Sequence, residues 1–253
     1  MGDKVGNDTV TRRAKAPPAG ASVIAILGRR TTTEGTGSSE DIWEGPTPDR
    51  PLPADAGVMM EVVSTSASDT AAGTGARTVD VVYLDANGTE QETTLTMNGT
   101  TAVQFATAIR RVLFMYVRTV GSNTVAVGDI SLRAQSGGAV YERISASGNR
   151  STSCHYTVPA GKKLTISDWY TCVDASRVSV RLRATVDAHD FANIRPVFLF
   201  QDVLDLTDSA MQMQYAEEFR RVYPELVDIE VRVWGASIGG RISAGFHGLL
   251  EDA

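Results

Sequence analysis

The sequence has few of the residues on which cross-linking and catalysis most often depend. It contains two cysteines and three histidines in 253 residues. Two cysteines are too few for the disulfide framework of a small secreted domain. No apolar run approaches the ~20 residues that a membrane-spanning helix needs, and residues 23–27 are too short for the core of a secretory signal. We therefore expect a soluble protein made in a cytoplasm, with no membrane partner.

Motifs for catalysis and cofactor binding are also missing. The sequence has no GxxxxGK[ST], no GxGxxG opening a helix and no HExxH. Residues 187–190 (DAHD) include side chains that could hold a cation, but we expect a solvated turn of polar residues there instead. We predict that the chain is not an enzyme and uses no cofactor or metal. The alternative is a hydrolase with an unrecognised site.

Composition and charge favour a β-rich structural protein. Hydrophobic residues make up 42% of the chain and charged residues 21%, which is enough for a packed core. Valine, isoleucine and threonine suit a pleated surface, and the 23 glycines suit its turns. The formal net charge of −6 argues against nucleic acid as the main partner, because such a protein normally presents a dense basic face.

Residues 1–55 differ from the rest of the chain. They hold six of the nine prolines and a group of basic residues, and they predict an extended N-terminal arm. We expect the arm to lie against a neighbouring subunit and to be anchored by its apolar residues. The candidates for this interface are Val23, Ile24, Ile26, Leu27, Ile42 and Trp43.

Residues 56–253 predict an all-β fold with two antiparallel β-sandwich, jelly-roll-like domains, at residues 56–145 and 146–253. Short alternating segments follow one another with a turn signal about every 10 residues, as in sandwiches and barrels. Asn87-Gly88 predicts a two-residue hairpin turn, and residues 104–108 a helical turn. Residues 177–183 alternate apolar with Ser and Arg, so this strand should have one apolar and one basic face.

Two segments leave alternatives open. Residues 209–221 place Met211, Tyr215 and Phe219 at helical spacing, whereas a strand would put Met211, Met213 and Tyr215 on one face. The aromatic residues at 43, 169, 170 and 234 could be platforms for sugars, although at strand spacing they more often belong to a core or an interface.

The stretch from Cys154 to Cys172 predicts a hairpin around Pro159-Ala160-Gly161. That register places Cys154 opposite Ser167, so a bond between the two cysteines would need a shifted register or a bulge. Two buried free thiols are one expectation. A disulfide from Cys154 or Cys172 to a neighbouring subunit is the other.

Several phrases, in their order, resemble a group of tailed-bacteriophage virion structural proteins. They read EDIWEG (40–45), SASDTAAGT (66–74), TVDV (78–81), LDAN (84–87), MNGTTAV (97–103), YTVPAGK (156–162), SAGF (243–246) and LLED (249–252). Each phrase consists mostly of residues typical of turns, so the resemblance rests on the order that the phrases share. The sequence departs from the group at His247-Gly248, where an acidic-apolar pair is usual.

The resemblance implies a non-enzymatic, β-rich component of a virion. Capsid decoration, the neck or collar, and tail attachment are all compatible with it. Its expected partners are further copies of the chain in a trimer or ring, and major capsid, neck or tail proteins. The alternative function is a tail- or fibre-associated module that binds a receptor or glycan.

Overall fold

The chain is an all-β protein built from antiparallel sheets. The computed structural model describes residues 20–253 except 36, 176, 188 and 189, so the basic residues before Gly20 and the centre of the DAHD segment lie outside it. Every strand pair in this part is antiparallel, and its helical structure is one 3₁₀ turn, Glu217–Phe219. These strands form four sheets in two compact units. The coarse prediction, all-β with antiparallel sheets, is therefore confirmed.

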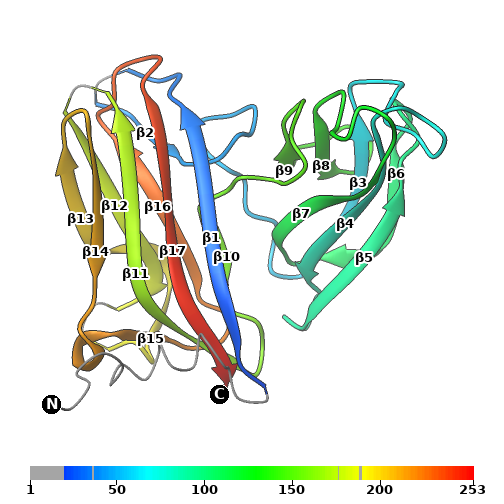
Figure 1. Cartoon of the computed structure of the whole chain (residues 1–253). Coiled ribbons are helices and arrows are strands. Elements are labelled where there is room, and N and C mark those ends of the chain that lie inside the picture. Colours follow the sequence, from blue (N-terminus) through cyan, green and yellow to red (C-terminus); the bar gives the residue numbers. More distant parts are fainter. Residues whose placement is uncertain (1–19, 36, 176, 188–189) are drawn as a thin grey trace, which may run out of the picture. The chain divides into compact units, whose positions relative to one another are not determined.

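The first unit is discontinuous in sequence and holds two sheets (Figure 1). The β11 sheet has the order β1-β17-β11-β14, with β15 also paired to β11; the strands are β1 Ser22–Thr31, β17 Arg241–Asp252, β11 Lys162–Asp174, β14 Ser209–Gln214 and β15 Arg221–Tyr223. The β12 sheet has the order β10-β16-β12-β13, with β2 also paired to β16; the strands are β10 His155–Thr157, β16 Asp228–Trp234, β12 Val178–Val186, β13 Ile194–Leu206 and β2 Ser39–Asp41.

The strands of the first unit pair in a nested pattern. When the short strands β2 and β15 are set aside, eight strands remain in chain order. The first pairs with the last (β1 with β17), the second with the seventh (β10 with β16), the third with the sixth (β11 with β14) and the fourth with the fifth (β12 with β13). This is the pairing of one long antiparallel ribbon, whose halves meet where β17 also pairs with β11 and β16 with β12.

Each sheet of the first unit buries one face. Side chains alternate between buried and partly exposed along β12 and much of β11, because successive residues of a strand point to opposite faces. The buried apolar residues on the four central strands include Leu164, Ile166, Trp169, Val180, Leu182, Val231, Val233, Ala244 and Phe246. At one edge, Tyr215 after β14 donates a hydrogen bond to Asp202 of β13, and Arg221 of β15 donates one to the carbonyl oxygen of Gln201. These bonds connect the two sheets.

The second unit, Trp43–Ser153, contains the other two sheets. One sheet has the order β6-β3-β8-β9, with β6 Val103–Ile109, β3 Val58–Ser64, β8 Ile130–Ala134 and β9 Val140–Ile144. The other has the order β5-β4-β7, with β5 Glu90–Thr96, β4 Ala76–Leu84 and β7 Arg111–Val120. Buried residues from both sheets form one core, including Met60, Val79, Val81, Met115 and Ile130.

The division into units differs from the predicted one. The sequence predicted boundaries after residues 55 and 145, whereas the chain leaves the first unit after Ile42 and returns to it at Cys154. The backbone N–H of Cys154 donates to the carbonyl oxygen of Ile42 at 2.9 Å, so exit and return lie side by side. Since one unit is discontinuous and the strands form four sheets, the prediction of two consecutive sandwich domains does not hold as made.

The expected arm is divided between the two units: its described residues up to Ile42 belong to the first unit, and those from Trp43 onward belong to the second. Residues 22–31 form β1 and pair along their whole length with β17 of the same chain, so this segment is an intrachain strand instead of an arm laid on a neighbour. Ile42 and Trp43 are 1% and 0% exposed, which makes them core residues of their own chain. The physical reason is that a β-strand gains main-chain hydrogen bonds from any free edge, and β17 of the same chain provides one.

Three local predictions also need correction. The turn at 159–161 carries the chain from one sheet to the other, because β10 pairs with β16 and β11 with β17; residues 154–172 are therefore no hairpin. Residues 104–108 lie in strand β6, not in a helical turn. Residues 85–89 do connect the hairpin of β4 and β5, but through a longer turn in which Asp85 accepts hydrogen bonds from the N–H groups of Asn87 and Thr89. In residues 209–221 the strand alternative is correct for 209–214.

Candidate functional site

The strongest candidate site is a row of arginine and aromatic side chains on the outer face of the β12 sheet. Val178, Val180 and Leu182 of β12 are buried, and the intervening Arg181 and Arg183 lie on the opposite face, as the alternation in sequence predicted. The register places Val203 and Phe200 of β13 opposite these two arginines. On the other side, Arg232 and Glu230 of β16 lie opposite Arg181 and Arg183, and Trp234 lies opposite Ser179. All these side chains therefore share one face.

Within this face the cations and rings alternate. The guanidinium carbon of Arg183 lies 5.2 Å from the ring centre of Phe198 and 5.9 Å from that of Phe200. The guanidinium carbon of Arg181 lies 4.8 Å from Phe200 and 4.7 Å from Trp234. We call Phe198, Arg183, Phe200, Arg181 and Trp234 the arginine ladder. Each cation–π contact contributes about 0.5–1 kcal/mol at an exposed site, so the ladder holds the two arginines in fixed positions.

The three arginines of this face differ in their counter-ions. Arg232 lies 3.1 Å from Asp41, and Arg183 lies 3.2 Å from Glu230. Arg181 donates through Nε to Ser179 Oγ at 3.3 Å, and its terminal nitrogens have neither a carboxylate nor another acceptor among the described residues. Arg181 therefore carries a positive charge that the described part of the chain does not compensate, directly opposite the cation of Arg232.

These groups surround a pocket of about 200 Å³. It is lined by Ser39, Arg181, Arg183, Phe198, Phe200, Arg232, Val233 and Trp234. Phe200 and Trp234 are 53% and 42% exposed, which is high for aromatic side chains. Beside the pocket, burial raises the pKa of Glu230 to about 8, and the negative charge of Asp41 adds to the shift. Near neutral pH this carboxyl is thus largely protonated, and the face is more basic than its residue count indicates.

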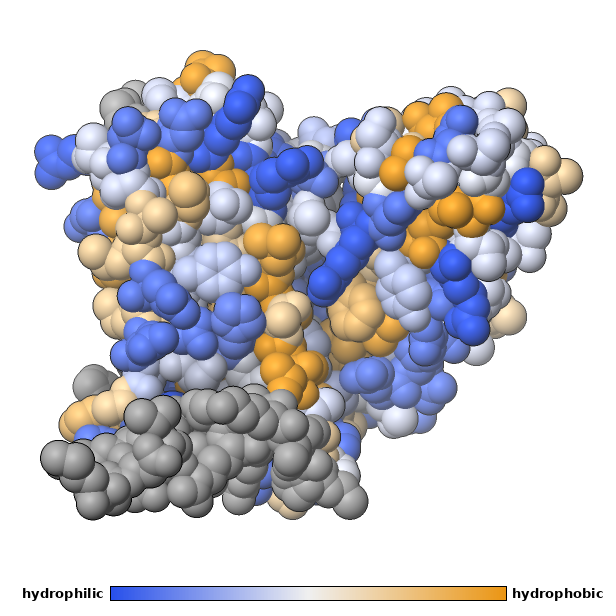
Figure 2. Space-filling model, in the orientation of Figure 1, coloured by the Kyte–Doolittle hydropathy of each residue, from blue (hydrophilic) through white to orange (hydrophobic). Residues whose placement is uncertain are grey.

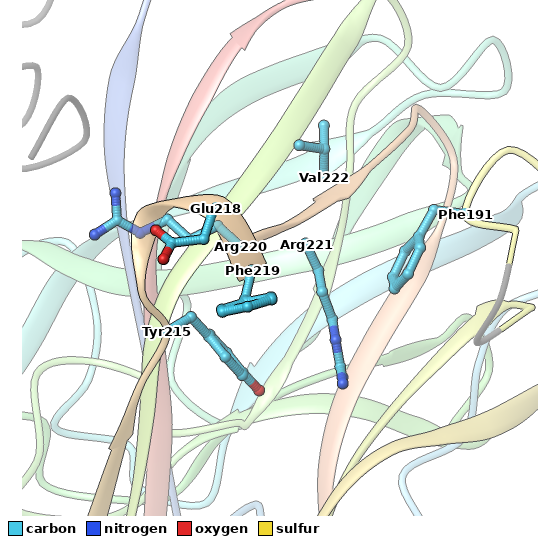
Figure 3. A pocket seen from close by; sticks show the side chains of 7 residues that line it. All are labelled: Phe191, Tyr215, Glu218, Phe219, Arg220, Arg221 and Val222. Atoms are coloured by element: carbon cyan, nitrogen blue, oxygen red, sulfur yellow. The ribbon is translucent and has the colours of Figure 1, made fainter.

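A second depression lies at the β15 end of the first unit (Figure 3). It has a volume of about 530 Å³ and is lined by Phe191, Tyr215, Glu218, Phe219, Arg220, Arg221 and Val222. In Figure 3 the rings of Tyr215 and Phe219 lie close to the side chain of Arg221, whereas Glu218 and Arg220 extend to the opposite side. The guanidinium of Arg221 is 5.5 Å from the Tyr215 ring, and it also bonds the Gln201 carbonyl oxygen. This cation therefore already serves the local structure.

A histidine–carboxylate pair lies on the outer face of the β11 sheet. His247 Nδ1 is 2.8 Å from Asp168 Oδ1, and the Tyr170 ring stacks on the imidazole with centroids 5.4 Å apart. Ser167 donates to Asp168 and to the carbonyl oxygen of His247, so its hydroxyl is not directed at the imidazole. The three side chains therefore lack the nucleophile–base contact of a hydrolytic site. Within the described residues, no three His, Cys, Asp or Glu side chains gather as metal ligands would.

The interface candidates from the sequence divide into two groups. Val23 and Leu27 of β1 are 47% and 43% exposed, and Ile24 is half-buried. Figure 2 shows apolar surface along this strand. Ile26, Ile42 and Trp43 are buried in their own chain and offer no surface to a partner.

The cysteines do not behave alike. Both are free thiols; Cys154 is buried and Cys172 is exposed, so the expectation of two buried thiols is wrong for Cys172. Burial raises the pKa of the Cys154 thiol far above its ordinary value, which makes that sulfur inert.

The sequence supplied part of the signal for the arginine ladder. The alternation in 177–183 identified the basic face of β12. Phe198 and Phe200 carried no such signal, because the bulge between Leu182 and Arg183 sets which β13 side chains meet the arginines. Of the tryptophans, Trp43 and Trp169 are fully buried, so they are core residues, and Trp234 alone of the three is exposed.

Comparisons with known proteins add little. No protein-family model matches the chain, and no curated protein matches it. Solved structures with some likeness include infectious bursal disease virus, Gt strain, at 11% identity over 96% of this chain and 77% of that chain, with a TM-score of 0.15. Another is the T=1 particle derived from infectious bursal virus, at 10% identity over 94% and 80%, also with a TM-score of 0.15. TM-scores this low carry no argument about fold or function.

Proposed function

We propose that the chain is a non-enzymatic structural protein of a bacteriophage virion, a capsid decoration or neck/collar component that assembles through its sheet surfaces. Its first unit is a jelly roll into which the second unit is inserted. The site of action is the particle, and the partners are further copies of the chain and neighbouring virion proteins.

The observation that carries the proposal is the nested strand pairing of the first unit. Eight antiparallel strands that pair first with last, and so on inward, in two four-stranded sheets, correspond to the jelly roll, an architecture used by viral capsid proteins, lectins and cupins. Architecture alone does not define function, so the choice among these classes depends on the sites. The ordered sequence phrases favour the virion class, and the His247–Asp168 pair lacks the contacts of a catalytic centre.

The surface of the first unit supports a role in assembly. Its edge strands β1 and β13 carry exposed apolar side chains, among them Val23, Leu27, Val197 and Val203. Exposed apolar edge strands can pair with a strand of another chain, and soluble monomers usually prevent this by covering the edge or placing charged side chains on it. Repeated weak contacts of this kind become strong in a particle, because each copy binds where its neighbours are already in place.

The proposal is tested on particles. Virions purified from a lysate of a phage that encodes this chain are analysed by quantitative mass spectrometry of their proteins. We expect the chain in many copies per particle, in a fixed ratio to the major capsid protein. Its absence from washed particles, with abundant chain left in the soluble lysate, would contradict the proposal.

A deletion that tests the role of the N-terminal residues in assembly has to leave strands β1 and β2 intact. A deletion of residues 1–50 removes β1 and β2 and leaves β17 without its partner, so failure of that variant to incorporate would report misfolding. A deletion that ends before Ser22 keeps both strands. Normal incorporation of that shorter variant would show that residues 1–21 are not needed for assembly.

A further inference from the structure

Arg181 has the features of a binding group more than those of a structural one. Its guanidinium carbon lies 4.8 Å from the ring centre of Phe200 and 4.7 Å from that of Trp234. Its neighbour across the strand pair is another arginine, Arg232, and like charges directly opposite each other destabilise a sheet. Arg232 is neutralised by Asp41, whereas Arg181 has no carboxylate in the described part of the chain. An external anion would relieve this repulsion.

The geometry restricts what that anion can be. Two rings lie against the guanidinium and its Nε donates to Ser179, so its terminal N–H groups remain for a ligand, and such an N–H edge matches a planar carboxylate through two parallel hydrogen bonds. The pocket of about 200 Å³ accommodates one small acidic group instead of a long polyanion. The carboxylate of Asp41 beside Arg232 disfavours a nucleic acid backbone, which needs a continuous row of uncompensated cations.

The rings also argue against a sugar. Aromatic platforms bind sugars through an open ring face. The Phe200 ring already has two guanidinium groups close to it, with their carbons 4.8 and 5.9 Å from its centre, which leaves less of the ring for a sugar. Trp234 has one face covered by Arg181.

The strand beside the pocket indicates the rest of the ligand. β13 is the edge of its sheet, and its exposed Val203 and Phe200 lie on the same face as Arg181. An extended peptide could add to such an edge with main-chain hydrogen bonds while its side chains alternate between the two faces. We propose that the arginine ladder and β13 form a docking site for an extended acidic segment of a protein partner, with a carboxylate of that segment bound by Arg181.

This site does not depend on the virion role. It would hold equally if the chain served another assembly, and failure of the docking test would leave the jelly-roll and particle proposals untouched.

The test uses the full chain and a capped peptide in which glutamate alternates with valine. A matched peptide with glutamine in place of glutamate is the chemical control. Trp234 provides the signal, because Trp43 and Trp169 are fully buried. We expect saturable quenching or enhancement of fluorescence by the glutamate peptide, little response to the glutamine peptide, and at least about tenfold weaker binding for Arg181→Gln, the equivalent of about 1.4 kcal/mol.

Arg177→Gln is the matched variant of the protein. Arg177 is exposed just before β12 and lies outside the ladder, so this change removes the same charge without touching the site. Equal affinity of Arg181→Gln and Arg177→Gln would overturn the proposal. Tighter binding of dextran sulfate than of the glutamate peptide, lost in the same variant, would also overturn it in favour of an anionic glycan. If Arg181→Gln does not fold, Arg181→Lys keeps the charge without the planar fork, and unchanged affinity in that variant overturns the carboxylate contact.

Discussion

Asp69 provides a sharp test of the second unit, because one buried carboxylate connects three segments there. It is 0% exposed and accepts four hydrogen bonds. Oδ1 accepts from the N–H groups of Ala76 and Val127 at 2.8 and 2.9 Å. Oδ2 accepts from Ser64 Oγ at 2.6 Å and from the N–H group of Gly128 at 2.8 Å. Asp69 thus connects the end of β3, the start of β4 and the loop before β8.

Replacing Asp69 by Asn keeps the shape and removes the charge and one acceptor atom. If the amide nitrogen takes the place of Oδ2, the Ser64 hydroxyl can rotate to accept, but the buried Gly128 N–H faces another donor. An orphaned buried donor costs about 1–3 kcal/mol, and the other bonds weaken because they are no longer charge-assisted. We expect Asp69→Asn to lower the free energy of unfolding by about 2–4 kcal/mol.

The assay is urea unfolding of the full chain followed by circular dichroism, with hydrogen exchange of peptides from β3 to β9 to assign the transition to the second unit. Asp85→Asn is the control, because Asp85 accepts two backbone N–H bonds in the same way but is only partly buried, and these bonds are exposed, so that water can replace them. The control should cost less than about 1 kcal/mol. Equal stability of Asp69→Asn and Asp85→Asn would refute the reasoning.

Three other predictions follow from single contacts in the first unit. Gly28→Ala should destabilise the chain by about 1–3 kcal/mol or more in thermal unfolding, because the added Cβ would lie 2.2 Å from the carbonyl oxygen of Ile42 and 2.5 Å from the backbone nitrogen of Cys154. Gly35→Ala is the control and should leave the stability almost unchanged, because its Cβ would meet nothing within 4 Å. The pKa of Glu230 in the folded chain is about 8, above its ordinary value of 4.5, so the native state binds a proton that the unfolded state has lost. The free energy of unfolding should therefore fall as pH rises between these two values. Glu230→Gln should reduce this dependence of stability on pH, and an unchanged dependence would contradict the raised pKa of Glu230. Alkylation of the folded chain with iodoacetamide should modify Cys172 and spare Cys154, and mass spectrometry that finds both modified would contradict the burial of Cys154.

The features that the sequence predicted well are local. The all-β class follows from short alternating segments, and the two faces of β12 could be read from 177–183. The hairpin of β4 and β5 was indicated by Asn87-Gly88, although the side chain of Asp85 selects a longer turn.

The features that it missed are non-local. β1 and β17 pair across almost the whole chain, and no local pattern shows which distant strand will complete a sheet. The turn at 159–161 illustrates the same limit, because Pro-Ala-Gly can close a hairpin or pass the chain to a second sheet, and only the pairings of β10 and β11 decide. The insertion of the second unit also depends on a long-range contact, the hydrogen bond between Cys154 and Ile42.

Only part of the arginine ladder could be predicted from the sequence. The arginines of β12 were identified, but their partners come from β13 and β16, and the stacking depends on the register of both pairs. Conversely, the apolar residues Ile26, Ile42 and Trp43 were expected at an interface because they belong to the proline-rich segment that predicted an extended arm. Ile26 is buried because β1 is itself part of a sheet, and Ile42 and Trp43 are buried directly after strand β2 of the same chain.

The most direct test of the central claim, that this chain acts by assembling, is the mass of the purified full chain in solution. Sedimentation equilibrium over a wide concentration range, with and without reductant, measures it. The account predicts a discrete multiple of 27.0 kDa, a trimer or a ring, that persists in reductant. A 27.0 kDa monomer at every concentration, in a chain that also fails to bind purified particles, would contradict it.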